Sequence, residues 1–136
     1  MILLDTSVLI DPPDAWPAPV LGSSAICLAE LLFGVQTAPT AAARSFRTRR
    51  LAVYRSMMEW IPFEEPDAES YAALAALVAR KRPSHARSKD MLIAAQALTL
   101  GIPAVELRDV YSRTELAMYG VSQATEVRVP VLNFLF

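Results

Sequence analysis

The sequence contains few of the residues that several classes of protein need. Of its 136 residues, one is cysteine, one is histidine and four are glycine. The single cysteine, Cys27, excludes an internal disulfide framework, and the cytoplasm is therefore the expected compartment. No apolar run approaches the ~18 residues of a membrane-spanning helix. Asp5 also interrupts what would be the apolar segment of a signal peptide, so we expect neither a membrane span nor a signal peptide.

Several kinds of catalytic site also lack their residues. His85 is the only histidine and lies in a basic segment, so zinc chemistry and a histidine base are not expected. No glycine-rich phosphate loop is present. The Asp-x-Asp motif of aspartyl phosphatases is absent, because Asp5 is followed by Thr6 and Ser7.

The pattern of apolar residues predicts a well-packed single domain over residues 1–136, with 54% hydrophobic and 20% charged residues. Short apolar segments alternate with segments of helical periodicity. Strands are predicted over 2–4, 23–26, 61–63 and 103–107, and helices over 28–35, 41–60, 67–81 and 88–100. This alternation predicts an α/β fold of three layers, in which helices flank a central, mostly parallel sheet.

Residues of known capping preference mark the ends of two of these helices. Ser88 is the expected N-cap of the last helix, and Gly101 is expected to close it. Asp67 is the expected cap of the helix before it, and Pro83 ends that helix.

Asp5 lies where the first predicted strand ends. In open parallel sheets, catalytic and binding residues collect at the carboxyl ends of strands, because the loops diverge there and leave a crevice. An Asp at this position is equally compatible with a helix cap for a helix that starts at Thr6.

Two further acids stand at the edges of apolar helices. Glu30 lies among Ile26, Leu28, Leu31 and Leu32, where an ionised carboxylate is costly unless it is paired or metal-bound. Asp90 occupies the first turn of the last predicted helix, where it can also complement the helix dipole. If these two acids and Asp5 converge, their repulsion requires protons or cations. Oxygen ligands without His or Cys favour Mg²⁺, with Mn²⁺ as the alternative.

Three segments together resemble the PIN domain family and, more narrowly, the VapC-type toxins of prokaryotic toxin–antitoxin pairs. These segments read MILLDTSVLID, SSAICLAELLFG and ARSKDMLIAAQALTLGIP, and they occur in order and at the usual intervals over roughly residues 1–105. The resemblance implies a PIN-like fold and a Mg²⁺-dependent endoribonuclease that attacks RNA with metal-activated water. It also implies a cognate antitoxin as partner and a homodimer.

The resemblance assigns the site residues as well. Asp5, Glu30 and Asp90 match the first three acidic positions of the family, and they are the predicted catalytic and metal-binding residues. Thr6 and Ser7 match the turn that supports the metal site. Cys27 departs from the Ser or Thr that the family commonly has there.

The sequence also departs from the family after the third segment. No acid stands at the usual spacing for the fourth position; Asp109 is the best substitute, with Glu106 next. Residues from about 106 onward are therefore divergent, and the apolar ending VPVLNFLF is unusual for a tail.

Basic residues are concentrated although the formal net charge is −1. Ten of the 13 lie within residues 44–55 and 80–89. Two such patches suit a phosphate backbone, but two solvated helix faces would give the same pattern. The predicted RNA-binding residues are Arg47, Arg50, Arg82, Arg87 and Lys89. Two alternatives to the nuclease remain, namely a catalytically impaired PIN-like protein that mainly binds antitoxin or RNA, and an unrelated Mg²⁺ phosphatase.

Overall fold

The sheet of the protein is built from four short parallel strands. The structure is a computed structural model that describes residues 2–12, 21–80, 88–101 and 104–105. The strands are β1 (Ile2–Leu4), β2 (Leu21–Ser24), β3 (Glu59–Ile61) and β4 (Ala104–Val105), in the spatial order β3-β2-β1-β4. All three strand pairings are parallel.

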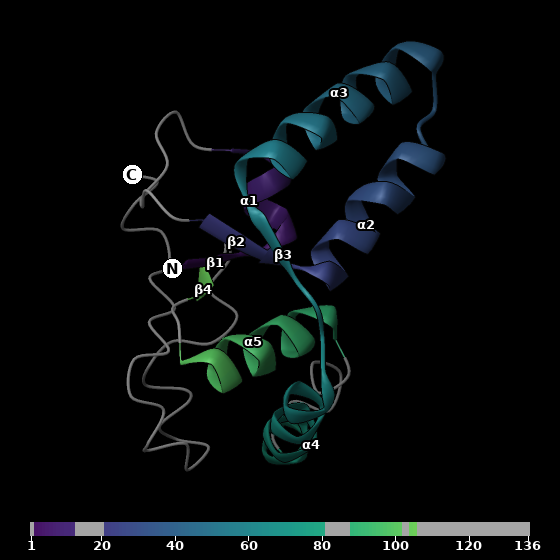
Figure 1. Cartoon of the computed structure of the whole chain (residues 1–136). Coiled ribbons are helices and arrows are strands. Elements are labelled where there is room, and N and C mark those ends of the chain that lie inside the picture. Colours follow the sequence, from purple (N-terminus) through teal and green to yellow (C-terminus); the bar gives the residue numbers. More distant parts are fainter. Residues whose placement is uncertain (1, 13–20, 81–87, 102–103, 106–136) are drawn as a thin grey trace.

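Helices cover both faces of this sheet. They are α1 (Thr6–Ile10), α2 (Ala25–Gln36), α3 (Ala41–Met57), α4 (Glu65–Ala79) and α5 (Lys89–Leu100). Figure 1 shows α1, α2 and α3 on one side of the sheet and α4 and α5 on the other. The predicted three-layer α/β fold is confirmed. Among the described residues, no helix combines the length and the apolar character that crossing a membrane requires.

The register of the strands places their carboxyl ends at one edge. Leu4, the last residue of β1, pairs with Ser23 on one side and with Val105 on the other. Helices α1 and α2 begin within two residues of the ends of β1 and β2. Helices α1 and α2 therefore both start at the carboxyl edge of the sheet, where Asp5 lies.

Two groups of buried side chains form the core. The larger group packs β1 against its neighbours and contains Leu3, Leu4, Val8, Leu9, Cys27, Tyr54, Met58, Ile93 and Ala97. The smaller group joins α4 to α5 and contains Leu74, Val78, Met91, Ala94 and Ala95. The central position of β1 explains why its residues are apolar without a break, since both faces of the strand are covered.

Several predicted boundaries are wrong. The helix predicted over 28–35 is α2, which begins at Ala25 and ends at Gln36. The strand predicted over 23–26 is β2, which ends at Ser24, because the Ser24 side chain accepts a hydrogen bond from Ile26 N (3.1 Å) and caps α2. The helix predicted over 41–60 ends at Met57, and β3 starts at Glu59 rather than at 61. Apolar residues stand on both sides of this junction, with Met57 and Met58 before Glu59 and Trp60 after it, so periodicity alone does not locate it.

The caps of the last two helices are partly as predicted. Ser88 accepts a hydrogen bond from Met91 N (3.3 Å), and Gly101 ends α5 in the left-handed region with φ of 63°; both predictions are confirmed. Asp67, however, is not the N-cap of α4. It lies three residues after the N-cap Glu64 and accepts a hydrogen bond from Glu64 N (2.7 Å), so α4 begins earlier than predicted.

Side chains of α3 bind the last carbonyl groups of α1. The Tyr54 hydroxyl donates to Leu9 O (2.8 Å), and Tyr54 is only 4% exposed. Arg50 donates to the carbonyls of Leu9 and Ile10 and stacks on Phe46, with its guanidinium carbon 4.7 Å from the ring centroid. Carbonyls at a helix end lack partners within the helix, so these donors stabilise α1 and fix α3 against it.

We predict that Tyr54→Phe lowers the free energy of unfolding by about 1 kcal/mol, because a buried hydrogen bond is lost while Arg50 still binds the same carbonyl. Urea denaturation measures the change. Thr48→Val is the matched control, since it removes a hydroxyl that donates to the Arg44 carbonyl on the exposed side of the same helix. If both variants lose the same free energy of unfolding, the hydrogen bond from Tyr54 to α1 contributes no more than an exposed hydrogen bond does.

Candidate active site

The carboxylate of Asp5 is held at the end of β1 with one oxygen free. The Leu4 carbonyl before it accepts hydrogen bonds from Ser23 Oγ (2.8 Å) and Cys27 Sγ (3.7 Å), which fix the strand end. Asp5 is the N-cap of α1, and its Oδ2 accepts from Ser7 N (3.2 Å) and Ser7 Oγ (2.8 Å). Its Oδ1 is buried without a hydrogen-bond partner among the described residues, and Asp5 as a whole is 6% exposed. The interpretation of Asp5 as a helix cap is therefore confirmed, and its metal-binding role stays a prediction, for which the buried Oδ1 is an acceptor without a partner among the described residues.

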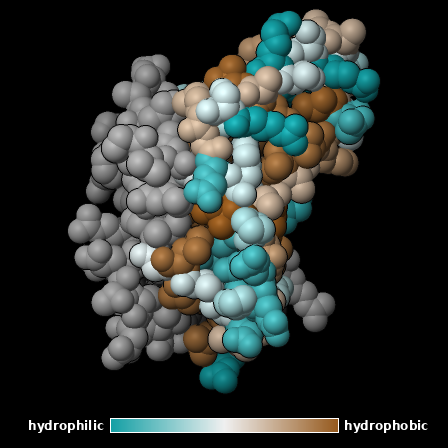
Figure 2. All heavy atoms as spheres, in the orientation of Figure 1, coloured by the Kyte–Doolittle hydropathy of each residue, from teal (hydrophilic) through white to brown (hydrophobic). Residues whose placement is uncertain are grey.

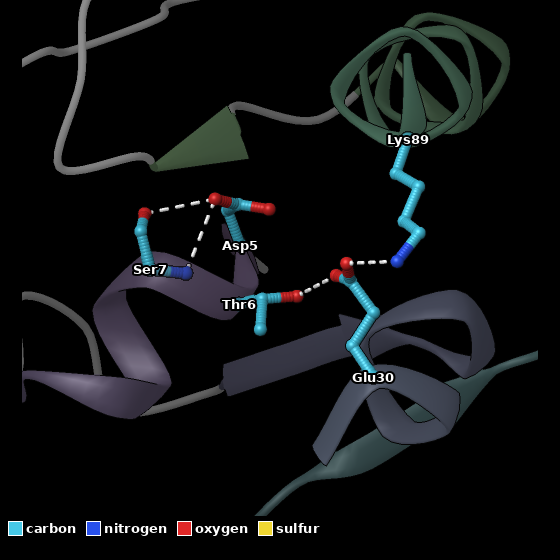
Figure 3. Close-up of polar contacts among 5 residues, drawn as sticks. All are labelled: Asp5, Thr6, Ser7, Glu30 and Lys89. Atoms are coloured by element: carbon cyan, nitrogen blue, oxygen red, sulfur yellow. Dashed lines mark hydrogen bonds and ion pairs between the residues drawn. The ribbon is translucent and has the colours of Figure 1, made fainter. Parts of the chain in front are cut away.

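Glu30 joins three helices at the same edge. Its Oε2 accepts a hydrogen bond from the Thr6 hydroxyl of α1, and its Oε1 lies 2.9 Å from Nζ of Lys89, the first residue of α5. Figure 3 shows Asp5, Thr6, Glu30 and Lys89 around one space between α1, α2 and α5. The Glu30 side chain is 23% exposed, and the Lys89 side chain is 63% exposed.

Asp90 lies in the first turn of α5, next to Lys89, and is partly buried. The pKa of Lys89 is raised, first by its hydrogen bond with Glu30 and by the charge of Glu30, and also by the charge of Asp90. Thr6 joins Asp5 and Glu30 by a hydrogen bond to Glu30, and Asp90 adjoins Lys89 in the first turn of α5, the helix whose first residue pairs with Glu30.

The donor chemistry of this space fits a hard divalent cation. Carboxylate and hydroxyl oxygens are the ligands that Mg²⁺ and Mn²⁺ prefer, and Asp5 Oδ1 is a buried acceptor in need of a partner. Glu30 already pairs with one cation, the Lys89 ammonium. Across the described ranges, no three His, Cys, Asp or Glu side chains are close enough to hold an ion together, so the acids do not form a closed cage while Lys89 pairs with Glu30.

Cys27 lies beneath this space and is fully buried. Burial raises the pKa of its thiol to about 11, and the charges of Asp5 and Glu30 act in the same direction, while hydrogen bonds with Thr6 and Ser23 act against it. The thiol is therefore a neutral packing group.

Two of the predicted RNA-binding arginines line a cavity beside Glu30. The cavity has a volume of about 460 Å³ and lies between the end of α1 and the helices α2 and α3. Its lining residues are Ile10, Glu30, Leu31, Gly34, Ala43, Phe46, Arg47, Arg50, Leu51 and Tyr54. Arg47 donates to Gly34 O (2.6 Å), and Arg50 is the residue that binds the carbonyls of α1. Both arginines thus have contacts within the fold.

The remaining predicted site residues lie outside the described residues. These are Arg82, Arg87, Asp109 and Glu106, and the divergent segment from about 106 lies there as well. The predicted role of Asp109 as a fourth acid stays a prediction.

Sequence reasoning missed the structural partners of two cations. Lys89 was predicted to bind RNA phosphates, and its ammonium contacts Glu30. A lysine as the first residue of a helix opposes the helix dipole, and this could have indicated a nearby carboxylate. The attachment of Arg50 to α1 had no comparable signal, because a helix end 40 residues earlier in the chain supplies the acceptor.

Comparison with known proteins identifies the family and the fold. Residues 2–111 match the PIN domain family. The chain therefore belongs to the PIN domain family. No curated protein sequence matches the chain.

Solved structures with the same fold include members of toxin–antitoxin systems. The chain is similar to one in the crystal structure of VapBC-5, a member of the VapBC family of toxin–antitoxin systems from Mycobacterium tuberculosis, with 29% identity, a TM-score of 0.68 and coverage of 91% of this chain and 94% of that one. It is similar to one in FitAcB from Neisseria gonorrhoeae, with 25% identity, a TM-score of 0.59 and coverage of 80% and 88%. DNA-bound VapBC from Salmonella typhimurium, at 19% identity, TM-score 0.65 and coverage of 80% and 87%, shares the fold.

We predict that Cys27 in the folded protein reacts with a disulfide reagent such as dithionitrobenzoate at pH 8 about 100-fold more slowly than in the unfolded chain. The reason is that a thiol with a pKa near 11 is almost entirely protonated at that pH and is also buried. Absorbance of the released thiolate measures the rate. Reaction in denaturant should reach one thiol per chain, since Cys27 is the only cysteine. A fast native reaction would contradict the buried position of the thiol.

Proposed function

We propose that the chain is a metal-dependent endoribonuclease that acts as the toxin of a toxin–antitoxin pair in the cytoplasm. Membership of the PIN domain family and the similarity to VapBC-5 over 91% of the chain support this class of activity. The observation that carries the metal-dependent part is the buried, unpartnered Oδ1 of Asp5, which shares one space with Glu30 and its bound ammonium.

The side chains at the sheet edge have separate tasks in this proposal. Asp5 and Asp90 would hold Mg²⁺, or Mn²⁺ in its place, and Glu30 would hold the metal or orient a water. A metal held there would supply positive charge to the scissile phosphate and would lower the pKa of a bound water. Ser7 fixes the rotamer of Asp5 by two hydrogen bonds, and Thr6 fixes one oxygen of Glu30.

Substrate positioning would come from basic side chains near this edge. Phosphate contacts by Arg and Lys give affinity without sequence information, and they make binding dependent on salt concentration. Arg47 and Arg50 line the cavity next to Glu30, and Lys89 borders the acids directly. Sequence choice in RNA would then come from its shape and from unstacked bases near the acids.

The cavity between α2 and α3 is the surface that we assign to the antitoxin. Ile10 and Phe46 line it and are 59% and 52% exposed, and Phe33 of α2 is 66% exposed. Figure 2 shows hydrophobic residues on this part of the surface, bordered by hydrophilic ones. An apolar surface patch with a polar rim is typical of a binding site for another protein. A homodimer remains part of the proposal as an inference from the family alone.

We predict that Asp5→Asn abolishes Mg²⁺-dependent RNA cleavage, with a fall of about 100-fold or more in rate, because a metal ligand supplies several kcal/mol of charge stabilisation. Asn caps a helix as well as Asp does, so α1 should persist. Cleavage of a radiolabelled RNA in Mg²⁺, and after EDTA, measures the effect. Asp90→Asn should behave in the same way.

The matched control is Asp11→Asn, which changes an exposed acid at the other end of α1 by the same charge. It should leave the rate unchanged. Undiminished cleavage by Asp5→Asn would reject the assignment. Absence of any EDTA-sensitive cleavage by the folded native chain, together with tight antitoxin binding, would favour the catalytically impaired binding protein instead.

We predict that Ile10→Ser weakens binding of the cognate antitoxin about tenfold, since truncating an apolar contact at the centre of an interface typically costs more than ~1 kcal/mol. Isothermal titration of purified antitoxin into the chain measures the affinity. Val53→Ser is the control, because Val53 is similarly exposed (52%) on α3 but does not line the cavity. Equal affinities for the two variants would place the antitoxin elsewhere.

A further inference from the structure

The positive charge of Lys89 stands at the N-terminus of a helix, where a cation is disfavoured. It is the first residue of α5, where the exposed backbone N–H groups make the helix end electropositive and disfavour a cation. Its ammonium nevertheless lies 2.9 Å from Glu30 Oε1, across the gap between α5 and α2. The carboxylates of Glu30 and of the adjacent Asp90 supply the compensating negative potential.

The contact places a full positive charge against Glu30. Its Oε1 pairs with the ammonium and its Oε2 accepts the Thr6 hydroxyl, so both oxygens of this carboxylate have a partner. Asp5 Oδ1, the buried acceptor in the same space, has no hydrogen-bond partner in the described part of the chain. A divalent cation held by Asp5 and Glu30 would therefore be repelled by the ammonium unless the ammonium moved away.

We propose that Lys89 is an internal counterion that competes with the divalent metal for Glu30. This inference rests on the proposed function, because it presumes a metal site at the acids. Without a metal, Lys89 compensates the charge of Glu30. Metal binding then releases the ammonium to solvent, which is easy because the Lys89 side chain is 63% exposed and flexible. Lys89 thereby lowers the affinity for the metal.

The test is Mn²⁺ binding by the full 136-residue chain, followed by the electron paramagnetic resonance signal of free Mn²⁺. Lys89→Met keeps the length of the side chain and removes its charge, and we expect a dissociation constant about tenfold lower than that of the native chain. Lys89→Arg keeps the charge and should bind Mn²⁺ as the native chain does. The rise in melting temperature on addition of Mn²⁺ should likewise be larger for Lys89→Met.

Arg55→Met is the control for net charge, since Arg55 lies in the last turn of α3 and no contact joins it to the acids among the described residues. It should leave Mn²⁺ binding unchanged. Circular dichroism establishes that each variant is folded. If Lys89→Met misfolds, Lys89→Gln provides the same comparison.

The outcomes separate the two proposals. If the native chain binds Mn²⁺ and Lys89→Met binds it equally or more weakly, the counterion role is overturned while the metal site stands. The metal site is rejected if Asp5→Asn does not reduce Mn²⁺ binding, or if neither the native chain nor Lys89→Met binds Mn²⁺. In that case the proposed metal-dependent nuclease is rejected as well.

Discussion

Negative charge confined at the carboxyl edge of a buried parallel sheet is the constraint around which the surrounding groups are arranged. Asp5 follows Leu3 and Leu4, which are fully buried, and is itself 6% exposed, so an ionised carboxylate there needs compensation. Ser7 donates its N–H and its hydroxyl to Asp5, Thr6 donates to Glu30, and Lys89 supplies a full positive charge. The donors come from α1 and the cation from α5, so compensating this charge joins the two helical layers across the edge of the sheet.

The parts of the fold that the sequence predicts well are those whose signals are local. The unbroken apolar run of β1 indicates a strand that is covered on both faces, and Ser88 and Gly101 mark the ends of α5 through the backbone groups that they satisfy. Asp5 and Glu30 follow from the same parallel arrangement, because Asp5 caps α1 and Glu30 lies on α2, and both helices start at the carboxyl end of a strand. The resemblance to the PIN family supplied the grouping of these acids with Asp90.

The features that escaped prediction depend on contacts between distant segments. Whether Ser24 continues a strand or caps a helix is decided by one hydrogen bond to Ile26 N, and both outcomes suit its composition. The assignment of Lys89 to RNA phosphates overlooked Glu30, which approaches only after the sheet has formed. Arg50 illustrates the same limit, since an arginine in a basic window looks solvated until its acceptor, the end of α1, is placed beside it.

Helix α1 contains only five residues, so its axis is about 7.5 Å long. Asp5 caps its first turn, and Tyr54 and Arg50 donate hydrogen bonds to its last carbonyls. Tyr54 and Arg50 also line the cavity between α2 and α3. Arg50 and Tyr54 therefore have two roles, since they line the cavity and also hold the end of the helix whose start Asp5 caps.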